Sequence, residues 1–186
     1  MAHRLDQAYM GGRSRLLMPF TPLHLGPALA LGLPLRRVLH LPTLLVASVA
    51  VDVEPLLVVA LGLSYPLHGY LHTLPAAVAY GLLLGYAMAL LEGRLGPLYR
   101  ALLLEEGAPA GRGPFLAAGV AGTVSHVLLD SPLYSDIQPL YPLGANPFFA
   151  PRLAPAVYGF CALSFLAGTL LYLSLWALRL KRGSGP

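Results

Sequence analysis

Residues 42–63 decide the fold class, and they read PTLLVASVAVDVEPLLVVALGL. A transmembrane helix needs about 20 predominantly apolar residues, so this run is long enough to cross a bilayer. Asp52, Glu54 and Pro55 interrupt it well inside its length. Because proline removes a backbone donor and disfavours a helical residue before it, we expect a break near Asp52–Pro55. Broken helices persist at membrane depth where they line a cavity, so the break marks a candidate functional region.

The composition of the whole chain agrees with a membrane protein. Hydrophobic residues make up 56% of the 186 residues and charged residues only 11%, whereas about a quarter of a soluble domain is charged. The net charge of +4 does not indicate a nucleic-acid partner, because the basic residues lie beside apolar segments instead of forming a stripe with interleaved aromatics. We therefore predict an all-α, polytopic transmembrane bundle whose main partner is the lipid bilayer.

Four further apolar segments complete the predicted bundle. They run from about Pro22 to Leu33, His68 to Leu91, Pro114 to Leu129 and Leu153 to Leu178. The first is short for a full crossing, so the prediction is four to five spans in a single domain over residues 18–182. Residues 1–17 are polar and basic, and we expect them to be a disordered extension. The single cysteine, Cys161, cannot form an intrachain disulfide and is interpreted as a packing residue.

The distribution of basic residues predicts an orientation in the cell membrane. Arg36 and Arg37, the predicted loop 92–113, and Arg179 with the tail after it hold most of the positive charge. Positively charged loops stay in the cytoplasm, so the C-terminus is predicted inside and the loop 131–151 outside.

Seven ionisable groups converge on one membrane face in this topology. The first and third helices begin at the outer side, and the second and fourth end there. The groups are His24, Asp52, Glu54, His68, His72, His126 and Asp130. Within helices, His68 and His72 would share one face at i,i+4 spacing, and so would His126 and Asp130. Ionisable groups inside a membrane are costly and usually functional.

The chemistry of these groups favours a metal site. Imidazole nitrogen and carboxylate oxygen together suit zinc, manganese or iron, and zinc is the favoured ion. A divalent cation also offsets the cost of buried carboxylates. With no cysteine among the seven groups, a cysteine-based structural zinc site is excluded. His40 lies outside the group and is interpreted as a cap or interfacial residue.

The order of the sequence blocks resembles the membrane-bound metal-dependent hydrolases of the YdjM type. The matching blocks are residues 22–26 (PLHLG), 51–55 (VDVEP), 68–73 (HGYLHT), 125–130 (SHVLLD) and 139–143 (PLYPL). Together they cover about residues 18–147. Three departures stand out: a basic residue of the family's histidine block is missing, its two histidines are four apart here instead of five, and Glu54 replaces the usual Asp.

The resemblance implies hydrolysis of an ester or phosphoester, possibly lipid-borne, by metal-activated water. The implied metal ligands are Asp52, His68, His72, His126 and Asp130. Glu54 or Asp52 would be the base, and His24 a ligand or an acid. Two other functions stay open. One is a non-enzymatic metal-binding or metal-transport protein. The other is a b-type haem protein with His72 and His126 as axial ligands, although the carboxylates fit haem poorly.

Overall fold

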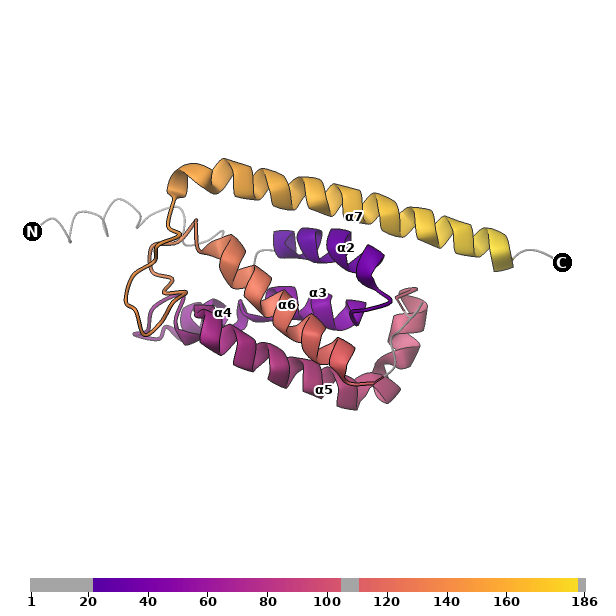
Figure 1. The fold of residues 1–186 in the computed structure, drawn as a ribbon, viewed down its shortest axis with the longest axis horizontal. Helices are drawn as coiled ribbons and strands as arrows, with labels where there is room; N and C mark the ends of the chain where they lie inside the picture. The colour runs from indigo at the N-terminus through magenta and orange to yellow at the C-terminus, as the bar shows by residue number, and fades with distance from the viewer. Residues whose placement is uncertain (1–21, 105–110, 184–186) are drawn as a thin grey trace, which may run out of the picture.

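The structure, a computed structural model, describes residues 22–104 and 111–183, and every regular element in these ranges is helical (Figure 1). The α-helices are α2 (Leu25–Leu35), α3 (Leu41–Ala50), α4 (Val53–Leu61), α5 (Leu74–Ala101), α6 (Gly113–Asp130) and α7 (Ala154–Gly183). Short 3-10 turns are η1 (Pro22–His24), η2 (Tyr70–His72) and η3 (Pro151–Leu153). The predicted all-α bundle is confirmed. The extension predicted over residues 1–17 lies outside the described residues.

Local signals explain where several of these helices begin and end. Thr73 caps α5, because its hydroxyl accepts a hydrogen bond from the backbone N–H of Ala76 at 3.3 Å. His40 caps α3 in the same way through Nδ1, which accepts from the N–H of Thr43 at 3.3 Å. Helix α4 stops at Gly62, whose φ of 60° is the left-handed conformation that glycine adopts without strain.

The predicted break in the second apolar segment is confirmed and lies at Val51 and Asp52, between α3 and α4. The N–H groups of Asp52 and Glu54 donate hydrogen bonds to carbonyls three residues earlier, at 3.2 Å each. The α-helical hydrogen-bond pattern thus changes to the tighter 3-10 pattern there. Pro55 has no N–H to donate and falls in the first turn of α4, where none is needed. The break turns Asp52 into a residue between two helices.

Helix α6 is central to the bundle because glycines let its neighbours approach closely. It packs against α3 on one side and α5 on the other. A Cβ on Gly119 would collide with the carbonyl oxygen of Gly81 in α5, and one on Gly122 would lie 2.5 Å from the Ala47 side chain in α3. Thr123 adds a hydrogen bond from its hydroxyl to the carbonyl of Ala77 at 2.7 Å. Small residues and hydroxyl groups of this kind hold helices together in membranes.

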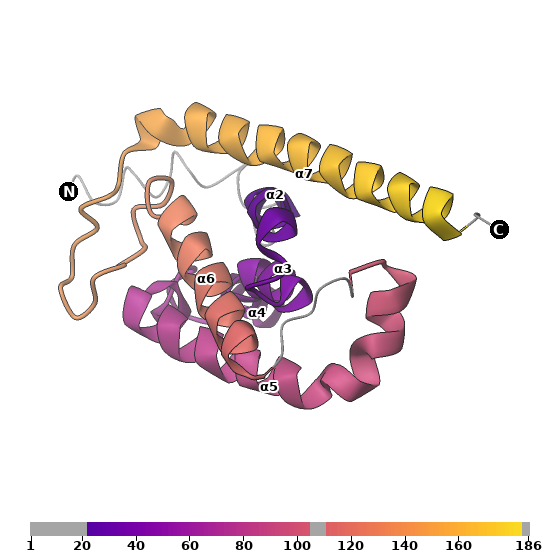
Figure 2. The ribbon, with the colours of Figure 1, turned by 45° about the vertical axis from the view of Figure 1, so that its right-hand side comes forward.

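Helix α7 runs the length of the molecule and packs against α2, as both views of the fold show (Figures 1 and 2). Most of its apolar side chains are exposed, Leu163 by 68% and Leu170 by 57%. Among the described residues, three stretches are long and apolar enough to cross a membrane: Leu41–Leu61, Leu74–Ala101 and Pro151–Arg179. The stretch Pro22–Leu35 is apolar but shorter. Exposed apolar surface on helices of this length is what a bilayer would cover.

The third apolar segment differs from its prediction at both ends. It was expected as a helix over residues 68–91, but α5 begins at Leu74, after the short turn η2. Thr73 and Pro75 set that start, since threonine caps the helix and proline suits its first turn. At the other end α5 continues to Ala101 and includes Pro97, so the predicted polar loop over 92–113 is wrong for its first part. The helix bends towards this end in Figure 2.

Candidate metal centre

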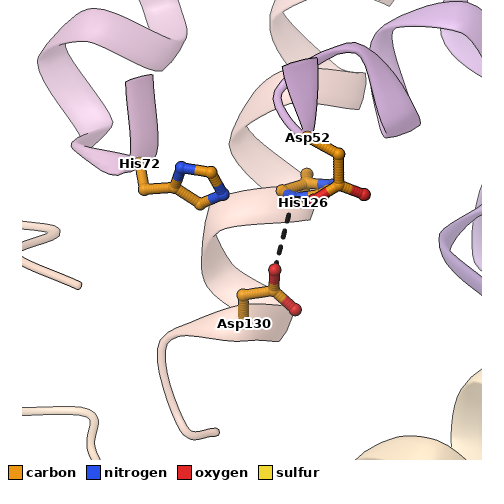
Figure 3. Close-up of side chains that lie close together, drawn as sticks. All are labelled: Asp52, His72, His126 and Asp130. Atoms are coloured by element: carbon orange, nitrogen blue, oxygen red, sulfur yellow. Dashed lines mark ion pairs between the residues drawn. The ribbon is translucent and has the colours of Figure 1, made fainter. Parts of the chain in front are cut away.

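Four buried side chains meet where α6 ends, beside the break between α3 and α4 (Figure 3). They are Asp52 from the break, His72 from the end of η2, and His126 and Asp130 from α6. One nitrogen or oxygen atom from each lies within 4.8 Å of the others. The four come from three segments far apart in sequence, so only the folded bundle brings them together.

His126 presents Nε2 to the two carboxylates. Its Nδ1 lies 2.8 Å from the carbonyl oxygen of Ser48, which can only accept, so Nδ1 carries a proton and Nε2 of the neutral ring has a free lone pair. That Nε2 lies 3.3 Å from a carboxylate oxygen of Asp52 and 3.3 Å from one of Asp130. Despite these distances, Nε2 makes no hydrogen bond of acceptable geometry. A cation between the three groups would satisfy all of them.

His72 has the same arrangement. Its Nδ1 lies 2.9 Å from Oε2 of Glu54, and its buried Nε2 has no hydrogen-bond partner. The Glu54 carboxylate also accepts from the backbone N–H groups of Gly69 at 3.0 Å and Leu71 at 3.2 Å. Glu54 therefore lies behind His72 and orients its ring. Metal-binding histidines typically donate their other ring nitrogen to a carboxylate or carbonyl in this way.

His40 shows what a structural histidine looks like in the same protein. It is as buried as the site histidines, at 2% exposure. Its Nδ1 accepts from the backbone N–H of Thr43, so the proton of the neutral ring is on Nε2, 3.3 Å from Oε2 of Glu92. The ring stacks on Phe115 with centroids 3.9 Å apart. Nδ1 of His40 thus has a hydrogen-bond partner and Nε2 an ion-pair partner outside the group of four, which agrees with its interpretation as a cap.

His24 adjoins the group of four without being one of its members. Its Nε2 lies 3.2 Å from Oδ1 of Asp130, and its Nδ1 lies 3.0 Å from Nδ1 of His126. His24 is buried and comes from η1, at the start of the first apolar helix. The predicted convergence of early and late segments thus extends to this residue.

His68 is also close, but the structure places it outside the group of four. It precedes η2 instead of occupying a helix, so the expected i,i+4 stacking with His72 is wrong, although the two rings lie 4.7 Å apart. Its Nδ1 lies 3.0 Å from Asp136, whose carboxylate also accepts from the backbone N–H of His68 at 3.2 Å. Burial alone would raise the pKa of Asp136, but the hydrogen bonds from His68 outweigh it and lower the pKa below its ordinary value.

Asp136 was missed in the sequence analysis, although a signal was available. It is the only acidic residue between Ser131 and Pro151, in a loop otherwise rich in apolar and aromatic residues. Of the eight acidic residues of the chain, Asp52, Glu54, Asp130 and Asp136 all contact a histidine at this end of the bundle.

The donor set fits a divalent transition metal. Two imidazole nitrogens and two carboxylate oxygens are the ligands that zinc, manganese and iron accept, whereas calcium and magnesium prefer oxygen alone. The Nε2 atoms of His72 and His126 make no hydrogen bond, which is unfavourable for buried polar atoms and would be relieved by a bound cation.

Comparison with known proteins adds no relative: no family model, no curated protein and no solved structure matches this chain.

Proposed function

We propose that this protein is a membrane-embedded, metal-dependent hydrolase of the YdjM type that cleaves an ester or phosphoester, carried by a lipid. The observation that carries the proposal is the matched pair of histidines, His72 and His126. Each has Nδ1 next to an acceptor and an Nε2 that makes no hydrogen bond. Both Nε2 atoms belong to the same group as the carboxylates of Asp52 and Asp130.

A divalent transition metal bound here would act as a Lewis acid, which would polarise the scissile group and lower the pKa of water towards neutrality. The protein's own residues hold and orient the site. Asp52, His72, His126 and Asp130 are the proposed ligands. Glu54 and the Ser48 carbonyl fix the two imidazole tautomers. His24, against Asp130, is the proposed proton donor to the leaving group.

The bilayer is the proposed environment, with the chain as a multi-pass protein of the cell membrane. Three stretches of spanning length and the exposed leucines of α7 support it. A site near the end of such a bundle reaches lipid headgroups, where ester and phosphoester bonds lie. That placement favours a lipid substrate over a soluble one.

A second candidate function is metal binding or transport without catalysis. The observation in its favour is burial: all four proposed ligands are buried, His72 and His126 completely. Structural zinc sites are closed by four protein ligands, whereas catalytic sites keep one position for water. The two functions imply the same metal content and differ in whether water and substrate reach the ion.

Metal analysis of the purified, detergent-solubilised protein tests what both functions share. We expect zinc, manganese or iron near one ion per chain, and a near-complete loss in His72→Ala because the site then lacks a nitrogen ligand. The matched control is His40→Gln, which removes an equally buried imidazole from the other end of α3 and should leave the metal content unchanged. Equal metal content in wild type and His72→Ala would refute the site, and a haem absorption band would favour the haem alternative.

Glu54→Gln should weaken metal binding without abolishing it. The glutamine keeps the shape of the side chain but loses the negative charge that orients and polarises His72. Loss of such an outer partner typically lowers metal affinity about 10- to 100-fold. Competition with a coloured chelator measures the change. Metal affinity equal to that of the wild type would show that Glu54 does not support the site.

A further inference from the structure

A small pocket lies where α2, α3, the end of α5 and α7 meet, at the opposite end of the bundle from the proposed metal ligands (Figure 1). Its apolar wall is formed largely by leucines, among them Leu33, Leu41 and Leu103. Tyr172, Trp176 and two arginines, Arg36 and Arg179, also line it. A wall of leucines beside two cationic side chains is complementary to an amphipathic anion.

The pocket lies at the ends of two apolar stretches that are long enough to cross a membrane. The apolar stretch Leu41–Leu61 begins at one of its lining residues, and the stretch Pro151–Arg179 ends at another. Trp176 is one turn before that end, where tryptophan is enriched in membrane proteins. Arg36 comes from the turn after α2 and uses Nη1 to donate to the carbonyl of Leu33 at 2.9 Å. Lipid phosphates and the first carbons of their acyl chains lie at this depth.

Leu103, which lines the pocket, has a backbone conformation that is unusual for leucine. Its φ is 55°, in the left-handed region that glycine normally occupies. It follows α5 in a Schellman motif, with the N–H of Leu103 bonded to the carbonyl of Arg100 and that of Leu104 to Tyr99. Glycine is the favoured residue at this position because a side chain there is strained. The chain nevertheless places a leucine here, and its side chain lines the pocket.

We propose that this pocket binds an anionic phospholipid, with the phosphate between Arg36 and Arg179 and an acyl chain along the leucines and Trp176. Basic pockets between helices at the cytoplasmic boundary recognise anionic headgroups. The guanidinium group suits phosphate because its planar donors match the phosphate oxygens. This site is separate from the proposed metal centre and does not depend on it.

Trp176 provides the measurement, because it is the only tryptophan in the chain. The protein is reconstituted into phosphatidylcholine vesicles that contain, at equal mole fraction, either brominated phosphatidylglycerol or brominated phosphatidylcholine. Bromine quenches tryptophan fluorescence on contact, so stronger quenching by the anionic lipid reports its preference for the pocket. We expect such a preference in the wild type, and Arg36→Gln should weaken the apparent affinity about fivefold. Arg36→Gln with Arg179→Gln should remove the preference.

Arg37→Gln is the matched control, because Arg37 neighbours Arg36 but does not line the pocket. It should keep the wild-type preference. Leu103→Gly should retain the melting temperature, since glycine adopts the positive φ freely, while lowering quenching by the anionic lipid. Equal quenching by the two lipids in the wild type would overturn the proposal. The same loss in Arg37→Gln and Arg36→Gln would overturn it as well.

Discussion

His72→Ala and Asp130→Ala should each remove nearly all metal binding, and the double variant should lose little more. The two side chains contribute to one group of four whose ligand atoms lie within 4.8 Å of one another. Residues that bind the same ion are strongly coupled, so the losses of metal binding caused by the two substitutions do not add. A site left with three ligands fails almost as completely as one left with two.

Melting temperature against added zinc measures this for the wild type, the two single variants and the double variant. Binding to the folded state alone stabilises it by about 2.7 kcal/mol at a concentration 100 times Kd, so the wild type should melt at a clearly higher temperature with metal. The three variants should show almost no response, and His40→Gln should respond as the wild type does. Single variants that keep the full response would show that the cluster is not a metal site.

Gly119→Ala should destabilise the bundle strongly, although it adds one methyl group. A Cβ on Gly119 would collide with the carbonyl oxygen of Gly81 and lie 3.1 Å from the backbone N of Gly85. Because these are backbone atoms, no side chain can rotate away, and α5 and α6 must separate. Overpacking of this kind typically costs about 1–3 kcal/mol, and occasionally more. Since α6 carries His126 and Asp130, metal binding should fall as well.

Gly93→Ala is the matched control for this prediction. Gly93 also lies inside an α-helix, α5, but a Cβ there meets nothing within 4 Å. Alanine favours an exposed helix by roughly 1 kcal/mol over glycine, so this variant should melt at or above the wild-type temperature. The same substitution should thus have opposite effects at two helical positions. A Gly119→Ala protein that melts like the wild type would show that α5 and α6 do not pack through their glycines.

The features that follow from local sequence were predicted well. Apolar runs bounded by polar residues gave helices, and Asp52 with Pro55 gave the break between α3 and α4. The pair His126 and Asp130 lies one turn apart on α6 as its spacing indicated, with the two side chains 3.3 Å apart. The start of α5 was misplaced: the predicted helix began at His68, whereas Thr73 caps α5 and the helix begins at Leu74.

The sequence by itself determined that the chain is an apolar helical bundle with histidines and carboxylates gathered at one end, because hydropathy and helical spacing are local properties. Only the tertiary structure decided which of those groups can share an ion. It places Glu54 behind His72 and pairs His68 with Asp136. It also places the Ser48 carbonyl against Nδ1 of His126. Which ring nitrogen of a neutral histidine has the lone pair depends on the partner of the other ring nitrogen. That partner comes from a segment distant in sequence. It comes near the histidine only when the helices pack through their glycines.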